Sequence, residues 1–395
     1  MGMPLADVTV LDFGQIYQGS YATLLLAKAG ANVIKIEPPG GEPLRRRTPP
    51  GAATTLPFAM LNANKRAITL NLKTPRGRDL LFDMARRADV LLENFAPGTM
   101  DALGTGWAVL QAVNSRLIYA SATGYGLSGP NRGSLAMDLT VQAASGILSV
   151  TGFPDGPPVR AGVTVADFMG GIHAYGGILT ALYERERSGV GRLVEIAMQE
   201  AVYFTLAAPM EQYRRSGVVP PRTGNSSGGS VTPFGVYPVR DGYVAIHTGT
   251  DQHWLNILDA AGRGDLKGEP RFATMHDRAQ HAEEINAIVA AWTQTLSKAD
   301  INETGRTYRI PMAAVRDVAD VMQDPHMHER GMLEWVEHPD LGRVVLPTTP
   351  IRVHGTDVAP AITSPRLGQH NEDVYRDWLG LPQQELDALR RDGVI

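Results

Sequence analysis

Asp167 is the residue whose type and surroundings in the sequence best suit covalent chemistry. An apolar run at residues 163–166 leads to this carboxylate, and the apolar spacing of residues 172–182 then predicts a helix. An Asp at a helix start caps free backbone N–H groups, and the helix dipole favours its ionised form. Such an Asp is either a structural cap or a carboxylate held ready to react, and position alone leaves both open.

Glycines are concentrated in the predicted helix that follows Asp167. Each glycine inside a helix costs roughly 1 kcal/mol relative to alanine, so a cluster of them needs a reason. The glycines are Gly170, Gly171, Gly176 and Gly177. We expect a backbone, a substrate or a second chain to come close to this helix.

The composition is that of an ordinary globular protein. The chain has 395 residues, of which 43% are hydrophobic and 20% charged, and its formal net charge is −4. This charge gives no reason to expect a nucleic-acid or membrane partner. The absence of cysteine excludes disulfides, thiolate nucleophiles and cysteine-based metal sites. We see no secretory leader and no apolar run of about 18 residues, so we expect a cytoplasmic protein.

The first third of the chain alternates between strand and helix patterns. The predicted strands are residues 8–13, 32–37, 66–72, 90–95 and 117–122, and the predicted helices are residues 20–28, 75–88 and 107–114. This alternation indicates βαβ units and a parallel sheet. Ligands of such sheets bind at the carboxyl ends of the strands.

The ends of these predicted strands carry residues that suit a phosphorylated nucleotide. Lys73 follows the third strand, Asn94 and Phe95 end the fourth, and arginines occupy positions 45–47 after the second. A cation and an amide can hold a phosphate, and an aromatic ring can stack on a purine. The arginines are equally consistent with a solvated basic turn. The glycines after the first strand lack the GxGxxG spacing, which disfavours a nicotinamide dinucleotide.

The rest of the chain predicts a smaller domain inserted into the larger one. Residues 194–206 predict a helix, a hairpin and helices follow within 225–330, and short strands and a final helix lie within 331–395. We expect a large domain from residues 1–210 and 331–395, a linker at 211–224, and a small domain at 225–330. Its histidines lack HExxH-type spacing, so no metal site is expected.

Motifs along nearly the whole chain resemble those of class III coenzyme A transferases, the formyl-CoA transferase-like (CaiB/BaiF) family. The matching stretches include VLDF at 10–13, GANVIKIE at 30–37, NANKR at 62–66, ENFAPG at 93–98, GFPDGPP at 152–158, RTGN at 222–225 and PRLG at 365–368. The ordered set is more specific than any single motif. The resemblance implies an α/β fold, with a Rossmann-like parallel-sheet large domain built from both chain ends, a smaller α+β domain and an interlocked homodimer.

The same resemblance implies that Asp167 is the nucleophile of a CoA transfer. In this family the carboxylate attacks an acyl-CoA thioester and passes through a mixed anhydride to an aspartyl-CoA thioester. The acceptor acid then repeats the cycle and leaves as its CoA ester. An Asp suits this chemistry because an anhydride exchanges thiolate reversibly. The implied partners are an acyl-CoA and a carboxylic acid, with coenzyme A as a substrate and no permanently bound cofactor or metal.

The CoA contacts implied by the resemblance fall at the predicted strand ends. They are Ile16, Tyr17, Leu70, Lys73, Asn94, Phe95 and Ala96. Tyr17 stands where formyl-CoA transferases carry a glutamine that steadies the reacting carboxylate, and Pro38, Ala102 and Leu135 stand where that subgroup has cations. These departures argue against the formyl/oxalate substrate pair. They also assign the CoA phosphates to the arginine loop, beginning with Arg45.

Contacts with the acyl and acid substrates are expected from Gln15, Arg160, Gly228 and Gly229. Gln15 and Arg160, together with Tyr17 and His173, suit a dicarboxylate such as succinate, malate or a methyl-branched diacid. The two glycines stand where formyl-CoA transferases have a longer glycine loop, so they form either a short lid or a plain linker.

Two other functions remain open. An α-methylacyl-CoA racemase-type isomerase needs a histidine at the position of Met137, which cannot transfer a proton. A non-catalytic acyl-CoA binder is the other alternative. CoA exchange between an ester and a free acid separates the transferase from both, and deuterium wash-in at the α-carbon identifies the isomerase.

Overall fold

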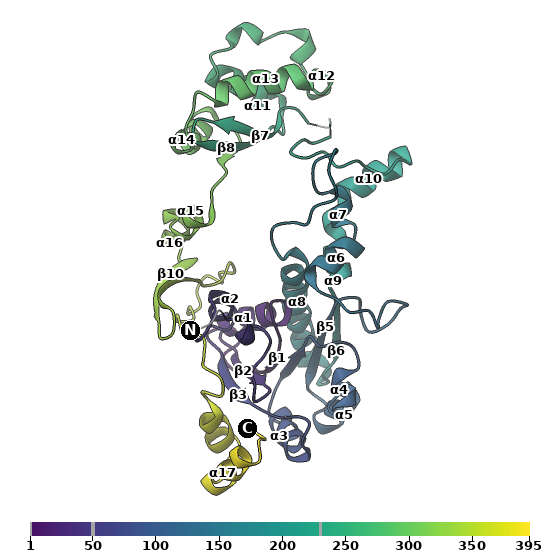
Figure 1. Cartoon of the computed structure of the whole chain (residues 1–395), viewed down its shortest axis with the longest axis vertical. Coiled ribbons are helices and arrows are strands. Elements are labelled where there is room, and N and C mark those ends of the chain that lie inside the picture. Colours follow the sequence, from purple (N-terminus) through teal and green to yellow (C-terminus); the bar gives the residue numbers. More distant parts are fainter. Residues whose placement is uncertain (1, 49–51, 229–230) are drawn as a thin grey trace. The chain divides into compact units, whose positions relative to one another are not determined.

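The structure is a computed structural model that describes residues 2–48, 52–228 and 231–395 (Figure 1). Two compact units make up the chain. The first comprises the chain up to Ile147, Ala161–Glu211 and Pro325–Ile395, and the second comprises Leu148–Arg160 and Gln212–Asp324. The first unit is therefore built from both ends of the chain, as expected.

A six-stranded parallel sheet forms the centre of the first unit. Its strand order is β3-β2-β1-β4-β5-β6, the order of a doubly wound dinucleotide-binding sheet. The strands are β1 (Thr9–Phe13), β2 (Asn32–Glu37), β3 (Arg66–Thr69), β4 (Val90–Glu93), β5 (Ile118–Thr123) and β6 (Leu193–Ala197). The predicted parallel α/β fold is confirmed.

Helices flank this sheet and a small hairpin follows it. The helices of the first unit are α1 (Gln18–Lys28), α2 (Leu56–Leu61), α3 (Pro75–Ala85), α4 (Thr99–Ala102), α5 (Trp107–Val113), α6 (Asp138–Ala144), α8 (Val165–Ser188), α9 (Met198–Tyr203), α16 (Pro325–Glu329) and α17 (Gln383–Arg391). The antiparallel hairpin is β10 (Leu333–His338) and β11 (Gly342–Pro347). Two further helices, α7 (Ile147–Val150) and α10 (Ala207–Ser216), contain the points where the chain passes from the first unit to the second.

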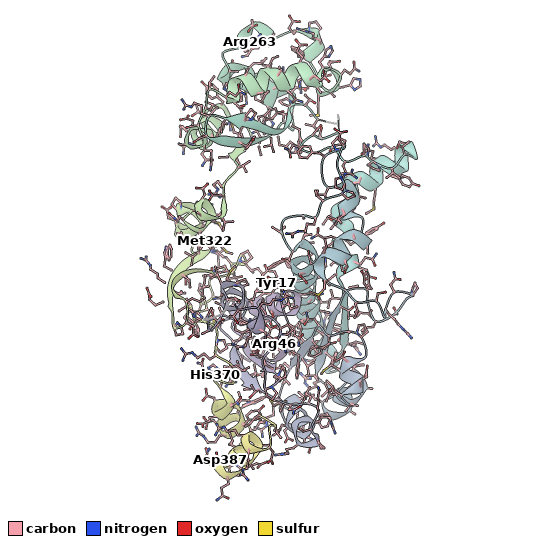
Figure 2. The ribbon with its side chains drawn as sticks, in the orientation of Figure 1. Tyr17, Arg46, Arg263, Met322, His370 and Asp387 are labelled. Atoms are coloured by element: carbon pink, nitrogen blue, oxygen red, sulfur yellow. The ribbon has the colours of Figure 1, made fainter. Side chains whose placement is uncertain are left out.

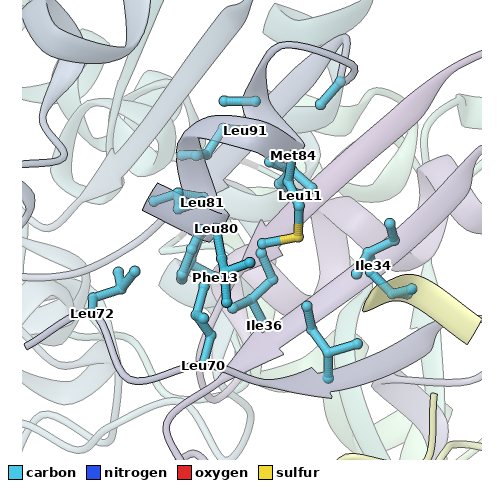
Figure 3. Packing of buried hydrophobic residues seen from close by; sticks show 14 of the residues in the cluster. Leu11, Phe13, Ile34, Ile36, Leu70, Leu72, Leu80, Leu81, Met84 and Leu91 are labelled. Atoms are coloured by element: carbon cyan, nitrogen blue, oxygen red, sulfur yellow. The ribbon is translucent and has the colours of Figure 1, made fainter. Parts of the chain in front are cut away.

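Alternate residues of β1, β2, β4 and β5 pack into two separate cores. On β1, Leu11 and Phe13 pack with α3, α5 and the C-terminal helix α17, whereas Val10 packs with α1 and α8. Figure 3 shows part of the first of these cores, which includes Leu80 and Met84 of α3 together with Leu11 and Phe13 of β1. Helices cover both faces of the sheet, because the strands carry apolar side chains on both sides.

One predicted helix, residues 194–206, is wrong in its first part. Residues Leu193–Ala197 form strand β6, which pairs in parallel with β5, and the helix α9 begins only at Met198. A short apolar run cannot be assigned to strand or helix by periodicity alone, and the free edge of β5 decides in favour of the strand. Other predicted strands and helices are observed with ends shifted by a few residues.

The second unit has its own core around a three-stranded antiparallel sheet. Its strands are β7 (Phe234–Val239), β8 (Gly242–His247) and β9 (Met312–Ala314). Its helices are α11 (Asp251–Ala260), α12 (Met275–Gln280), α13 (Ala282–Thr293), α14 (Lys298–Tyr308) and α15 (Val318–Met322). Trp254 and Trp292 are buried in its core, and the predicted hairpin around Gly242 is confirmed.

The described ranges of the chain contain neither a membrane-spanning helix nor a cluster of metal-ligating side chains. None of the helices there is long and apolar enough to cross a bilayer. The same residues contain no group of three or more His, Asp or Glu side chains arranged to hold a metal ion.

Candidate active site

Asp167 lies in the first turn of α8 but does not cap it. The N-cap is Thr164, and Asp167 is the third residue of the helix. The backbone N–H groups of Ala166 and Asp167 donate instead to Oδ1 of Asp138, at 2.8 and 3.3 Å. Asp138 on α6 therefore does the capping that the sequence assigned to Asp167. Within the described ranges, no hydrogen bond involves the side chain of Asp167.

A buried glutamine fixes Asp138 to the start of α8. Gln142 Nε2 donates to Asp138 Oδ2 at 2.6 Å, and Gln142 Oε1 accepts from the backbone N–H of Ala161 at 3.0 Å. The two side chains are one helical turn apart on α6, so they face the same way. Together they hold the segment from Ala161 to Asp167 against α6. These bonds fix the position of the Asp167 backbone.

The electrostatic surroundings of Asp167 differ from the sequence-based expectation. Burial, and after it the charge of Asp138, raise the pKa of Asp167 to about 7, while Arg47 acts in the opposite direction. The helix start does not hold Asp167 ionised at low pH because its N–H groups are already bonded to another carboxylate. Asp167 therefore exchanges its proton close to neutral pH.

The glycines of α8 explain its close contact with α1. A Cβ atom at Gly171 would lie 2.7 Å from the backbone oxygen of Gln18, and one at Gly170 would lie 2.6 Å from Gln18 Nε2. A Cβ at Gly177 would meet Val194 at 2.8 Å, whereas Gly176 has nothing within 4 Å. The predicted close approach is thus mainly to another helix of the same unit.

Hydrogen bonds from partly buried groups hold the loop after β1 in place. Asn94 Oδ1 accepts from the backbone N–H of Gln15 at 2.7 Å, and Asn94 Nδ2 donates to the Gln15 backbone oxygen at 3.0 Å. Ile16 has φ of +58°, a conformation that is unfavourable for a β-branched residue. Its backbone N–H donates to Glu42 Oε2 at 3.1 Å. Such strain persists only where the surroundings enforce it.

Beneath this loop lies a buried ion pair. Lys65 Nζ donates to Asp12 Oδ2 at 2.9 Å, and both side chains are completely buried. Lys65 also donates to Ser20 O and to Thr23 Oγ1 at the start of α1. Burial lowers the pKa of Lys65 to about 8, although Asp12 acts in the opposite direction. The pair ties β1 to the start of α1 and so supports the loop between them.

A cavity of about 260 Å³ joins this loop to Asp167. Of the residues predicted from the sequence, it is lined by Gln15, Ile16, Asn94, Phe95, Ala96 and Asp167. Gln18, Met137 and Met198 also line it. The cavity thus brings together residues from the ends of β1 and β4 and from the start of α8, as expected for a parallel sheet.

A second cavity, of about 150 Å³, shares Phe95 with the first. It is lined by Leu70 and Lys73 after β3, by Pro38 after β2, and by Phe95 itself. Leu70 is buried and Lys73 is exposed. The two cavities share Phe95 and Gln15, so the predicted contacts form two adjoining groups.

Two predicted residues near these cavities make other contacts. The ring of Tyr17 stacks on Phe168, with centroids 6.0 Å apart. Arg45 donates to Glu37 at 2.8 Å and to the backbone oxygen of Pro365 at 3.0 Å, and its guanidinium lies over the ring of Phe58. Its neighbours on the 3₁₀ turn Arg45–Arg47 are exposed. Tyr17 and Arg46 are labelled in Figure 2.

The remaining predicted residues belong to the second unit or lie outside the described residues. Arg160 is exposed, and Gly228 adopts φ of +68° with its N–H donating to Ser226 Oγ. Gly229 lies outside the described residues.

Sequence reasoning did not identify Asp138, Gln142 or Gln18. The spacing of Asp138 and Gln142 by four residues on a helix was a usable signal, because it places an acceptor and a donor on one face. Gln18 offered no such signal, since a lone glutamine at a helix start is usually exposed. In the structure it is 2% exposed, and its Nε2 has no hydrogen-bond partner among the described residues. A buried unpaired amide costs roughly 1–3 kcal/mol.

Comparisons with known proteins agree on one family. A family model, "CoA-transferase family III", matches residues 5–371. The succinyl-CoA–D-citramalate CoA-transferase of Chloroflexus aurantiacus is 36% identical over 99% of this chain and 98% of the relative. The formyl-CoA:oxalate CoA-transferase of Streptomyces avermitilis is 35% identical over 100% of both chains. The crystal structure of a CAIB/BAIF family protein from Brucella suis matches with a TM-score of 0.85 and 32% identity, over 96% of this chain and 100% of the other.

Proposed function

The chain belongs to CoA-transferase family III and is a CoA-transferase, and we propose that it transfers coenzyme A through an aspartyl-CoA thioester on Asp167. The observation that supports this role is the position of the Asp167 carboxylate. It lies in a cavity at the strand ends, and no hydrogen bond from the described residues engages its oxygens. A carboxylate without such bonds keeps its lone pairs available for attack.

The proposed reaction consists of four exchanges at carbonyl carbons. Asp167 attacks the acyl-CoA carbonyl, the C–S bond breaks, and CoA-thiolate leaves a mixed anhydride. The thiolate attacks the carbonyl of Asp167, and the donor acid leaves as its carboxylate. The acceptor carboxylate then attacks the aspartyl-CoA thioester and releases the thiolate again. Thiolate attack on the acceptor carbonyl yields the new CoA ester and restores Asp167, with no net gain or loss of protons.

The raised pKa of Asp167 suits this reaction. A carboxylate with a pKa of about 7 is more basic than an exposed one and is half ionised near neutral pH. Burial removes part of its hydration, which makes it a better nucleophile once ionised. Activity should therefore require the ionised form and should fall below pH 7.

We assign the two adjoining cavities to the two ends of the CoA ester. Lys73 supplies a positive charge for the CoA phosphates, and Leu70 and Phe95 supply apolar surface for the adenine. Ile16, Asn94 and Ala96 line the cavity that contains Asp167, which we assign to the pantetheine arm and the thioester. Arg45 is engaged by Glu37, so its proposed role is to hold the arginine loop in place.

For the acid substrates we propose dicarboxylates. Oxalate and citramalate, the acids named for two similar proteins, both carry two carboxyl groups. One carboxylate reacts at Asp167, and the other needs a cation nearby. Arg47 is the exposed cation whose charge acts on Asp167, so we assign it to the second carboxylate. Gln15 lines the same cavity and contributes a neutral contact.

The test is to detect and remove the proposed intermediate. Purified protein is incubated with succinyl-CoA and then with hydroxylamine or borohydride, and peptides are analysed by mass spectrometry for modification at Asp167. Asp167→Ala should abolish transfer of CoA to succinate, malate, citramalate and oxalate. Asp79→Asn, at an exposed position on α3, is the matched control and should retain activity. Full activity in Asp167→Ala, or an adduct elsewhere, contradicts the proposal.

We also propose that the chain acts as a homodimer. Light scattering of the purified protein, coupled to gel filtration, should give twice the mass of 42.6 kDa. A mass equal to that of one chain at working concentration contradicts this proposal.

A further inference from the structure

Gln18 is a buried polar residue at the candidate active site that the fold itself does not use. It is the first residue of α1, is 2% exposed, and lines the same cavity as Asp167. Its Nε2 finds no hydrogen-bond partner in the described part of the chain. Nearby polar groups are used differently: Asn94 bonds to the backbone of Gln15, and Asp138 bonds to the start of α8. An unpaired buried donor in a substrate cavity indicates a partner that arrives with the substrate.

The packing of α8 places this carboxamide against Gly170, one helical turn after the proposed nucleophile. A Cβ atom at Gly170 would lie 2.6 Å from Gln18 Nε2 and 3.1 Å from Met198 Cγ. Gly170 follows Asp167 by three residues, so the two positions share one face of the helix. The Gln18 side chain therefore packs against α8 where glycine leaves room for it, one turn after Asp167. Any larger residue at 170 would displace the carboxamide.

We propose that Gln18 is a further catalytic residue whose Nε2–H donates to the oxygen that becomes negative in each tetrahedral intermediate. When a nucleophile adds to a carbonyl carbon, the π electrons move onto the oxygen, and a fixed N–H donor stabilises that charge. When the carbonyl re-forms, the leaving group departs with the C–S or C–O bonding pair. Gln18 gains and loses no bond or proton. This role rests on the proposed function, because it requires covalent chemistry at Asp167.

A neutral amide suits this position better than a charged donor. It does not titrate, so it adds no further ionisation to that of Asp167. It also leaves the negative charge of the incoming acid unneutralised before reaction, so its contribution is greatest in the intermediates. Removing one such donor from an acyl-transfer site typically lowers kcat by about 10²–10³-fold.

The test replaces the carboxamide without changing the space that it fills. Gln18→Met has a similar volume and no N–H donor. Gln384→Met makes the same chemical change at an exposed position on α17 and is the matched control. Wild type, both variants and Asp167→Ala are assayed for CoA exchange with succinyl-CoA and acetyl-CoA against succinate, malate, citramalate and oxalate. Thermal unfolding of each variant reports whether it is folded.

The expected result for Gln18→Met is a fall in kcat of about 100-fold or more, with KM for the CoA ester within about threefold of wild type. A loss below tenfold, or a loss that appears in KM, overturns the role of Gln18 while leaving the transferase reaction intact. If Gln18→Met does not fold, Gly170→Ala takes its place, because the added methyl group must move the carboxamide, and the same criteria apply. Absence of exchange by wild type with every pair, or full activity of Asp167→Ala, overturns the proposed function and the role of Gln18 with it.

Discussion

Replacing Asp138 by Asn should move the acid limb of the activity profile to lower pH. The change removes a negative charge next to Asp167 but keeps an oxygen that can accept from the backbone N–H groups of Ala166 and Asp167. The charge of Asp138 raises the pKa of Asp167, so its removal lowers that pKa. The helix start itself should remain capped.

The size of the shift follows from simple electrostatics. Neighbouring carboxylates near a protein surface repel by roughly 1–3 kcal/mol, which corresponds to about 1–2 pKa units. Burial is the larger cause of the raised pKa and is unchanged, so we expect a shift of about one unit. At pH 6 the ionised fraction of Asp167 should rise from about a tenth to about a half. The kcat/KM at pH 6, expressed as a fraction of each enzyme's maximum, should therefore rise roughly fivefold.

The assay is kcat/KM for CoA transfer measured from pH 5 to 9, with a control that loosens the same contact without changing charge. Gln142→Met removes the bonds from Gln142 to Asp138 and to Ala161 but leaves the Asp138 carboxylate in place. Both variants should lose roughly 1–3 kcal/mol of stability, because each leaves a buried polar group without its partner. Only Asp138→Asn should shift the acid limb. An unmoved limb in folded Asp138→Asn, or an equal shift in Gln142→Met, would refute the reasoning.

Three further predictions follow from the same site. Arg47→Gln should shift the acid limb to higher pH, because Arg47 lowers the pKa of Asp167, and an unchanged profile would show that Arg47 does not act there. Burial raises the pKa of Asp167 from 3.8 to about 7, so the stability that wild type has relative to Asp167→Asn should fall as pH rises from about 4 to 7. Urea unfolding at pH 8 should find the variant more stable by roughly 2–4 kcal/mol, with little difference at pH 4, and equal stabilities at pH 8 would contradict the raised pKa. Lys65→Met should cost roughly 3–5 kcal/mol, because Asp12 would remain buried without its cation, and a loss below about 1 kcal/mol in the same experiment would count against this.

Local pattern was sufficient for most strands of the parallel sheet. Apolar runs separated by helices predicted β1 to β5 as strands, because hydrophobic periodicity can be read directly from the residues. It was not sufficient for β6, because the pattern of Leu193–Ala197 is consistent with either a helix or a strand. The strand forms because it can pair with the free edge of β5, and that edge exists only after the sheet has formed.

The sequence by itself determined that an Asp lies in the first turn of a glycine-rich helix and that asparagine, phenylalanine and lysine follow neighbouring strands. Only the tertiary structure decided the state of that Asp. Asp138 is 29 residues away along the chain, yet its oxygen occupies the N–H groups that Asp167 was expected to cap. Burial and this second carboxylate then raise the pKa of Asp167, and the α1–α8 contact places Gln18 against Gly170, one turn after it. The physical reason is that desolvation and charge repulsion depend on distances in space, which sequence spacing does not specify.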